Sequence, residues 1–179
     1  MKKIYKIVLI SFLIILLDQL SKIIIRCSLE VGHTISVIGK FFKITHLENS
    51  GAAWSILNGK WIFLVILSLL FLVFIFRCIK RDDRNTKLNI LSYSFLIGGI
   101  IGNIIDRIIY QTVTDFLSFR IIKYDFPVFN LADTFIVIGM FMLILDVFLE
   151  GREEGPMASE YKKIKEGKYG KGNSRRWKY

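Results

Sequence analysis

Four long apolar runs constrain this chain more than any other feature of its sequence. They extend over residues 4–25, 61–76, 88–109 and 126–148. A bilayer core about 30 Å thick is crossed by roughly 20 mostly apolar helical residues, which is the length that these runs approach. The second run is the shortest, and we expect its helix to extend into the flanking residues. The sequence therefore predicts an all-α membrane protein with four transmembrane helices.

The composition agrees with a membrane protein and excludes several other classes. Apolar residues make up 53% of the 179 residues before the 13 glycines are counted, and soluble domains reach about 45–50% with glycine included. A disordered chain, a collagen and a disulfide-rich secreted scaffold are therefore excluded. Lys2, Lys3 and Lys6 precede the apolar core of the first run, as in a signal peptide, but no small-residue cleavage site follows it. We therefore expect it to remain as a transmembrane span.

Lysine and arginine are distributed unevenly between the connections. Five lie in residues 77–87 and nine in residues 151–179, whereas residues 26–60 hold four and residues 107–130 hold three. Because basic residues mark cytoplasmic segments, both termini are expected in the cytoplasm and the two long connections outside. The net charge of +10 then indicates attraction to anionic lipid at the cytoplasmic face and not nucleic-acid binding. The expected domains are a four-helix membrane domain over residues 1–150 and a basic, disordered cytoplasmic tail over residues 151–179.

The long connection after the first run contains a second type of structure. Residues 31–47 alternate in polarity on both sides of Gly39, which predicts a small β element on the outer face. His33 and His46 lie in this segment without the spacing of metal ligands, and we interpret both as structural residues.

Ionisable side chains are costly at membrane depth, so each one in the predicted spans marks a candidate functional site. With a rise of about 1.5 Å per helical residue, Asp18 lies roughly 21 Å above the cytoplasmic end of the first span and Asp106 roughly 27 Å above that of the third. Asp133 opens the fourth span from the outside, and Asp115 lies in the loop that precedes it. The four carboxylates therefore converge near one level, at or just below the outer surface.

Helical spacing adds polar partners to two of these acids. Asp18 and Lys22 lie at i and i+4, where they can form an ion pair. Asn103 and Arg107 share a face in the same way, with Asp106 on the neighbouring stripe. Each arrangement also has a structural interpretation, as a buried strut in the first span and as an interfacial anchor in the third. The spacing alone leaves both interpretations open.

Three glycines in the third span predict close helix packing. Gly98, Gly99 and Gly102 are small residues of the kind that lets membrane helices approach each other. We therefore expect another helix against this part of the third span.

Asp115 and Asp133 are the candidates for chemistry. Asn130 and Asp133 also have the pattern of a helix start, whereas Asp115 has neither a neighbouring cation nor a capping context. Two carboxylates held together in a low-dielectric site share a proton, so that one acts as a base and the other donates a proton. Hydrolysis of a peptide bond needs such a pair. No Ser-His or Cys-His pair competes with it, and without clustered metal ligands we expect neither a metal nor another cofactor.

Five short blocks of this sequence occur in the order in which a known family has them. They are Asp18-Gln19-Leu20-Ser21-Lys22, Asn49-Ser50-Gly51-Ala52-Ala53-Trp54, Gly102-Asn103-Ile104-Ile105-Asp106-Arg107, Val113-Thr114-Asp115-Phe116 and Phe129-Asn130-Leu131-Ala132-Asp133. The chain resembles the lipoprotein signal peptidases, also called type II or prolipoprotein signal peptidases, over about residues 4–150. Any one block is weakly specific, and all five in order are highly specific.

The resemblance implies a function and a set of site residues. It implies an aspartic endopeptidase of the bacterial cell membrane, with its active site at the outer face. Such an enzyme removes the signal peptide from prolipoproteins by cleaving before a diacylglyceryl-modified cysteine. Asp115 and Asp133 match the family's catalytic pair, and Trp54 stands where the family usually has phenylalanine. The remaining positions match residues that bind substrate or support the pair: Asp18, Lys22, Asn49, Gly51, Asn103, Asp106, Arg107 and Asn130.

Two other kinds of membrane protein also use buried acids. A small transporter or proton-relay protein would use the same carboxylates, but along a path across the membrane and not near one face. A presenilin-type intramembrane protease would carry a Gly-x-Gly-Asp motif, which the sequence around Gly102 and Asp106 lacks. The transporter or proton relay is kept as the alternative function.

Overall fold

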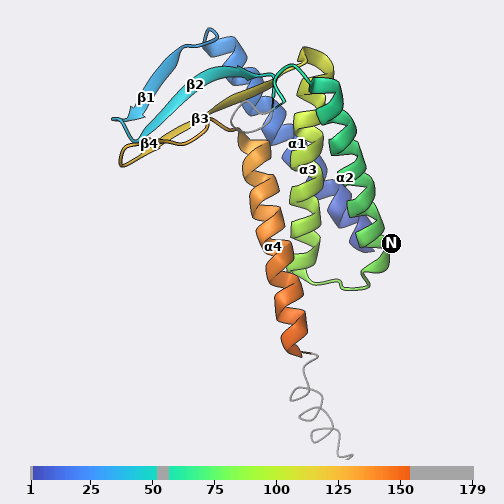
Figure 1. The fold of residues 1–179 in the computed structure, drawn as a ribbon. Helices are drawn as coiled ribbons and strands as arrows, with labels where there is room; N and C mark the ends of the chain where they lie inside the picture. Colours follow the sequence, from blue (N-terminus) through green and yellow to red (C-terminus); the bar gives the residue numbers. More distant parts are fainter. Residues whose placement is uncertain (1, 52–56, 154–179) are drawn as a thin grey trace, which may run out of the picture. The chain divides into compact units, whose positions relative to one another are not determined.

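The computed structural model describes residues 2–51 and 57–153, which contain four long helices and four short strands (Figure 1). The chain divides into two compact units, residues 1–143 and residues 144–179. The fold and the site described below belong to the first unit. Trp54 and residues 154–179 lie outside the described residues, so the predicted domain boundary and the predicted tail stay predictions.

The four helices confirm the prediction of four spans. They are α1 (Lys2–Ser28), α2 (Trp61–Arg81), α3 (Lys87–Tyr110) and α4 (Leu131–Glu153). Each is long and apolar enough to cross a membrane. The second helix takes its additional residues from the C-terminal flank, where it continues beyond the apolar run to Arg81.

The central helix of the first unit is α3, which contacts α1, α2 and the start of α4. Its buried residues form one hydrophobic core with residues of α1 and α2, among them Leu96, Ile7 and Ile75. The prediction of close packing at the glycines is confirmed. A Cβ added at Gly98 would lie 2.6 Å from Ile14 Cγ2, and one added at Gly99 would lie 2.5 Å from the Ala132 carbonyl oxygen.

The link between α2 and α3 is fixed by Asp82. Its carboxylate accepts hydrogen bonds from Arg84 Nε at 2.8 Å and from Asn89 Nδ2 at 2.7 Å. Its carbonyl oxygen accepts one from Lys3 Nζ at 2.8 Å, near the start of α1. These contacts tie together three helix termini at the end of the bundle away from the strands (Figure 1).

The strands form one antiparallel sheet in the order β1-β2-β3-β4, which extends sideways from the other ends of the helices (Figure 1). Strands β1 (Thr34–Ile38) and β2 (Phe42–Asn49) are the predicted β element. Strands β3 (Val113–Ile121) and β4 (Tyr124–Asp125) belong to the second long connection. The expectation that Asp115 lies in a loop is therefore wrong. It lies on β3 opposite Leu47, in a run rich in the β-branched and aromatic residues that favour strands.

The start of the fourth helix also differs from the prediction. The apolar run begins at residue 126, but the helix begins at Leu131. Residues before it pair with β3 instead, because Leu117 N–H donates to Phe129 O at 2.8 Å and Phe129 N–H donates to Leu117 O at 3.1 Å. Hydropathy does not distinguish an apolar strand segment from the first turn of a helix, and here the strand pairing determines the structure.

Candidate active site

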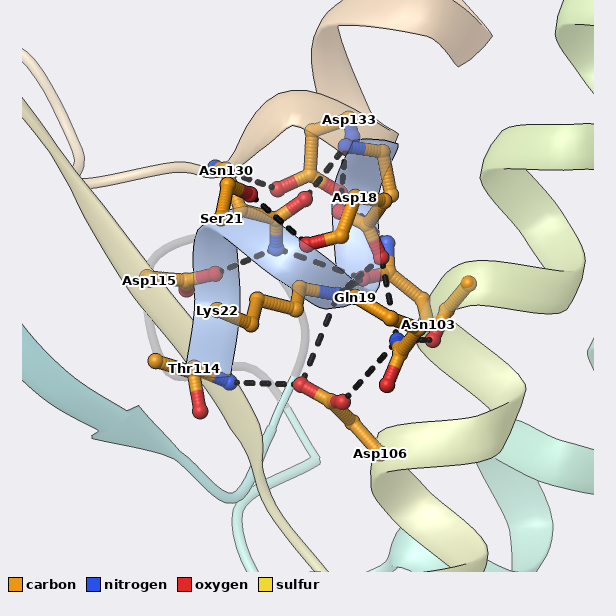
Figure 2. Close-up of polar contacts among 12 residues, drawn as sticks. Asp18, Gln19, Ser21, Lys22, Asn103, Asp106, Thr114, Asp115, Asn130 and Asp133 are labelled. Atoms are coloured by element: carbon orange, nitrogen blue, oxygen red, sulfur yellow. Dashed lines mark hydrogen bonds and ion pairs between the residues drawn. The ribbon is translucent and has the colours of Figure 1, made fainter. Parts of the chain in front are cut away.

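Lys22 lies at the centre of a buried group of charges between α1 and α3 (Figure 2). Its Nζ atom is 2.8 Å from Asp18 Oδ2 and 3.4 Å from Asp106 Oδ2, and it donates a hydrogen bond to Asn103 Oδ1 at 2.9 Å. The side chains of Lys22, Asp18 and Asp106 are fully buried. Burying charges is tolerable only when they are paired and hydrogen-bonded, which is the case for this group. The predicted ion pair between Asp18 and Lys22 is confirmed.

Asp18 connects α1 to α4. Its Oδ1 atom accepts a hydrogen bond from the backbone N–H of Ala132 at 3.0 Å, in the first turn of α4. The first N–H groups of a helix have no partner within the helix, and the helix dipole favours a negative charge near them. The carboxylate of Asp18 therefore holds the N-terminus of α4 against α1 and α3.

Asn130 and Asp133 form the cap of α4, as the sequence pattern predicted. Asp133 N–H donates to Asn130 Oδ1 at 3.0 Å, and Asn130 N–H donates back to Asp133 Oδ2 at 3.2 Å. This reciprocal arrangement is a capping box. The second oxygen of the Asp133 carboxylate accepts a hydrogen bond from Asn103 Nδ2 at 2.8 Å. Both oxygens of this carboxylate are therefore held in place.

Asp106 fixes the start of β3. Its Oδ2 atom accepts a hydrogen bond from Thr114 N–H at 3.0 Å, one residue before Asp115. Its Oδ1 atom lies 2.8 Å from Arg26 Nη2, and Arg26 Nε donates to Thr114 Oγ1 at 2.8 Å. Gln19 Nε2 donates to the same Oδ1 at 3.2 Å. Of the two interpretations that the spacing left open for Asp106, the interfacial anchor does not match these contacts, which direct the carboxylate inward to α1 and β3.

Arg26 and Gln19 are site residues that the sequence analysis did not select. Arg26 follows Lys22 at i+4, as Lys22 follows Asp18, so these three residues form one stripe of α1. Extending the stripe by one turn would have identified Arg26. No comparable spacing marks Gln19, whose amide contacts α3 through Asp106 and the Gly102 carbonyl oxygen.

Asp115 is almost completely buried and accepts hydrogen bonds from two side-chain amides, of which that of Asn130 is drawn in Figure 2. Its Oδ1 atom accepts a hydrogen bond from Asn130 Nδ2 at 2.7 Å, and its Oδ2 atom accepts one from Asn49 Nδ2 at 2.8 Å. Burial, together with the negative charge of Asp133, raises the pKa of Asp115 to about 7. The two amides act in the opposite direction but are outweighed. Asp115 is therefore suited to carry a proton near neutral pH.

The two candidate acids are linked through Asn103 and Asn130. Asn130 Nδ2 donates to Asp115 Oδ1 and, at 3.2 Å, to Asn103 Oδ1, while Asn103 Nδ2 donates to Asp133. Both acids line a cavity of about 1070 Å³. The apolar part of its lining includes residues 126–129 and residues 136–138. A carboxyl group pair thus faces a space that is large enough for a peptide segment.

Arg107 and Gly51 also line this cavity. Arg107 Nη2 donates to the Gly51 carbonyl oxygen at 3.3 Å, and Nη1 donates to the Asn103 carbonyl oxygen at 3.4 Å. Gly51 N–H donates to Asn49 Oδ1 at 3.0 Å, which orients the amide that binds Asp115. The structure therefore brings all ten predicted site residues into one connected network. Gly51 contributes backbone atoms, and its neighbours 52–56 lie outside the described residues.

The two histidines lie apart from this cavity. His46 is buried on β2, with Nδ1 2.8 Å from the Leu29 carbonyl oxygen, and neither His46 nor His33 belongs to the cavity lining. His33 is exposed and lies 3.6 Å from Glu30. Among the residues that the structure describes, no group of three or more potential ligands could hold a metal ion.

Comparisons with known proteins agree with the fold. A family model described as signal peptidase (SPase) II matches residues 10–149. A bacterial membrane enzyme solved at 2.3 Å by the in meso method is 33% identical, with a TM-score of 0.77 over 84% of this chain and 92% of that chain. A second bacterial membrane enzyme, solved at 1.9 Å, is 35% identical, with a TM-score of 0.71 over 79% of this chain and 91% of that chain. The match covers all of the predicted site residues.

Proposed function

Because the chain belongs to the signal peptidase II family, we propose that it is a membrane aspartic endopeptidase which removes the signal peptide from prolipoproteins. The bond cleaved lies before a cysteine that carries a diacylglyceryl group. The observation that carries this proposal is the convergence of Asp115 and Asp133 on one cavity, with their carboxylates linked through the amides of Asn103 and Asn130.

The proposed reaction divides two roles between the acids. Asp115 carries the proton, since burial and the charge of Asp133 raise its pKa to about 7. Asp133 accepts a proton from a water molecule, whose oxygen attacks the carbonyl carbon of the scissile peptide bond. Asp115 donates its proton to the carbonyl oxygen. Collapse of the tetrahedral intermediate breaks the C–N bond, the leaving amine takes the proton held by Asp133, and the new carboxyl group returns a proton to Asp115, which restores both acids to their starting states.

The cavity lining suits a substrate that is partly peptide and partly apolar. Asn49 and Arg107 line the cavity and carry N–H groups that can donate to a substrate backbone. The apolar residues of α4 and of residues 126–129 offer contacts for the signal peptide. The lipid chains of the substrate remain in the bilayer, and the scissile bond lies at its surface.

The orientation of the site in the membrane is part of the proposal. Asp115 and Asp133 lie near the C-terminal end of α3, whereas the basic link at residues 77–87 joins its N-terminal end. Because basic residues mark the cytoplasmic side, the cavity faces outward and both termini face the cytoplasm. Water then reaches the acids from outside without crossing the hydrocarbon.

The test compares purified wild-type protein with Asp115→Asn and Asp133→Asn on a diacylglyceryl-modified prolipoprotein. We expect cleavage before the lipidated cysteine by the wild type, none by either variant, and none of the unlipidated precursor. Asp83→Asn, an identical change at an exposed position of the α2–α3 link, is the matched control and should retain activity. Cleavage by the Asp115→Asn/Asp133→Asn double variant would contradict the proposal. An inactive but folded wild type with Asp18-dependent ion flux in liposomes would favour the transporter or proton relay.

A further inference from the structure

Two turns of the sheet meet at the end that is remote from the active-site acids. They are the β1–β2 turn at residues 39–41 and the β3–β4 turn at residues 122–123. We call residues 38–43 and 120–125 the sheet tip. A second cavity of about 610 Å³ lies between the two turns. Its lining residues are Lys40, Phe41, Arg120, Ile122, Lys123 and Asp125, of which only Asp125 also lines the larger cavity.

The sheet tip concentrates the basic residues of the two long connections. These connections hold seven lysines and arginines in residues 26–60 and 107–130. Arg26 and Arg107 belong to the active-site network, and Lys60 precedes α2. The other four lie in the sheet tip: Lys40, Lys43, Arg120 and Lys123.

The second cavity therefore has a positive charge. Three cationic side chains line it together with one carboxylate, that of Asp125. Asp125 is already engaged by Arg120, with distances of 2.5 Å to Nε and 2.7 Å to Nη2. Lys40 and Lys123 remain to bind an anion that enters between the turns. A phosphate group, which accepts several charge-assisted hydrogen bonds, matches this arrangement.

Apolar side chains surround the charged cavity and face solvent. Ile122 is 93% exposed, and its φ of 60° lies in the left-handed region, where glycine or asparagine is usual and a β-branched residue is disfavoured. Phe41, Ile121 and Tyr124 are each at least half exposed. Neither turn geometry nor solubility favours isoleucine at position 122, whereas contact with a lipid surface does. Basic and apolar residues side by side are typical of segments that lie in a membrane interface.

Contacts within the sheet tip hold its two turns together. Arg120 N–H donates to the Phe41 carbonyl oxygen at 2.9 Å, which joins the two turns through the backbone. The ring of Phe119 stacks on Phe42 with centroids 4.7 Å apart and meets Phe41 edge-on at 5.7 Å. Binding therefore needs little ordering of the chain, which is the condition for useful affinity at a small site.

We propose that the sheet tip binds the phosphate of an anionic phospholipid in the leaflet on which the sheet lies, with Lys40 and Lys123 contacting the headgroup and Ile122 and Phe41 contacting the acyl chains. Only two residues separate the end of α3 from β3, and the sheet extends sideways from the helices (Figure 1). In a membrane its tip would therefore lie over the lipid beside them. Together with the proposed function, this anchor would hold β3, and therefore Asp115, at a fixed height above the substrate's lipid chains.

The test uses the full-length chain reconstituted into bilayer vesicles, with a tryptophan as the reporter. Ile122→Trp places the reporter at the sheet tip, and Val31→Trp places it in the exposed loop before β1, at the opposite end of that strand. The quenchers are phosphatidylglycerol and phosphatidylcholine with brominated acyl chains. Because the chain already contains tryptophan, the fluorescence of the parent chain is subtracted from that of each variant. We expect strong quenching in Ile122→Trp, weak quenching in Val31→Trp, and a preference for phosphatidylglycerol at the first position only.

Charge-matched substitutions then test the phosphate contact. Each basic residue near an anionic surface contributes about fivefold in affinity. Lys123→Gln in the Ile122→Trp chain should therefore reduce the preference for phosphatidylglycerol about fivefold. Lys60→Gln removes the same charge from the same connection as Lys40 but outside the sheet tip, and should leave the preference unchanged.

Two results would overturn this proposal. Equal quenching by both lipids would show apolar contact without phosphate binding. Quenching no stronger in Ile122→Trp than in Val31→Trp would show that the tip is no nearer the acyl chains than the loop before β1. Neither measurement depends on peptide cleavage. A failure here therefore leaves the proposed peptidase untouched, and an inactive peptidase leaves the lipid contact testable.

Discussion

The backbone N–H of Ala132 donates a hydrogen bond to Asp18 Oδ1 at 3.0 Å, across 114 positions of sequence. Asp133 is the next residue, so the carboxylate on α1 determines where the first turn of α4 presents one of the two proposed catalytic acids. The same Asp18 carboxylate is paired with Lys22 at 2.8 Å. The charges of Asp18 and Lys22 therefore hold the site in place although they take no part in the proposed reaction.

Asp18→Asn should destabilise the protein strongly. It leaves Lys22 buried with only the longer contact to Asp106, at 3.4 Å, as an ion pair. Removing one partner of a buried ion pair costs about 3 kcal/mol or more. Thermal unfolding in detergent should show a clearly lower midpoint than the wild type, and the exposed Asp83→Asn should show no change. A midpoint equal to that of the wild type would mean that the Asp18–Lys22 pair does not stabilise the fold.

Two substitutions at Asn130 separate its structural and its supporting role. Asn130→Ser keeps an oxygen that can cap α4 but removes the amide that donates to Asp115 and Asn103. Asn130→Ala removes both and should cost about 1 kcal/mol of stability more than the serine variant. Losing a preorganised donor lowers kcat by roughly 10²-fold or more, so both variants should cleave slowly. The comparison of unfolding midpoints with kcat for the two variants checks this, and a serine variant with full activity would exclude the amide from the proposed mechanism.

The contacts between residues close in sequence could be predicted from the sequence, and the contacts between distant residues could not. The Asp18–Lys22 pair and the cap of α4 follow from spacings of four and three residues, which helix geometry fixes. The contact of Asn49 with Asp115 spans 66 positions and depends on the register between β2 and β3. A single sequence does not determine such a register, because shifting one strand by one residue reverses every side chain. The pattern placed Asp115 near the other three carboxylates, whereas the assignment of Asn49 to the same site came from the family resemblance.

The fold shows the same division. The four helices follow from the length of the apolar runs, and the β1–β2 hairpin follows from alternation around Gly39. Strand β3 was missed because the apolar residues beside Asp115 were interpreted as a loop between two spans. Most of its pairs are with β2, which is distant in sequence.

The pH dependence of cleavage should reflect Asp115. Its pKa is raised to about 7, so the proton that it donates in the proposed reaction is lost as the pH rises through 7. We expect kcat/KM to fall above about pH 7. Asn49→Ala removes a hydrogen bond that favours the ionised carboxylate, so the alkaline limb should move upward by roughly one pH unit. A profile of kcat/KM against pH for both proteins measures this alkaline limb. If the limb does not move in Asn49→Ala, it reports the ionisation of another group.

The same pKa has a consequence for stability. A carboxyl group whose pKa is higher in the folded state than in the unfolded state binds more protons when folded between the two pKa values. The contribution of Asp115 to the free energy of unfolding should therefore decrease as the pH rises from about 4 to about 7. Asp115→Asn removes this contribution. The difference in unfolding midpoint between the variant and the wild type should grow in favour of the variant over that pH range, whereas a constant difference would contradict the raised pKa.

Two glycines of α3 separate packing from site geometry. A Cβ at Gly102 would lie 2.5 Å from Asp18 Oδ2, and one at Gly98 would lie 2.6 Å from Ile14 Cγ2. Both Gly98→Ala and Gly102→Ala should destabilise the protein, because overpacking a close contact typically costs about 1–3 kcal/mol. Only Gly102→Ala displaces the carboxylate that holds Ala132, and with it the first turn that carries Asp133. At a temperature where both variants are folded, Gly102→Ala should therefore lower kcat much more than Gly98→Ala. Equal kcat values in the two variants would show that the Asp18 contact supports stability alone.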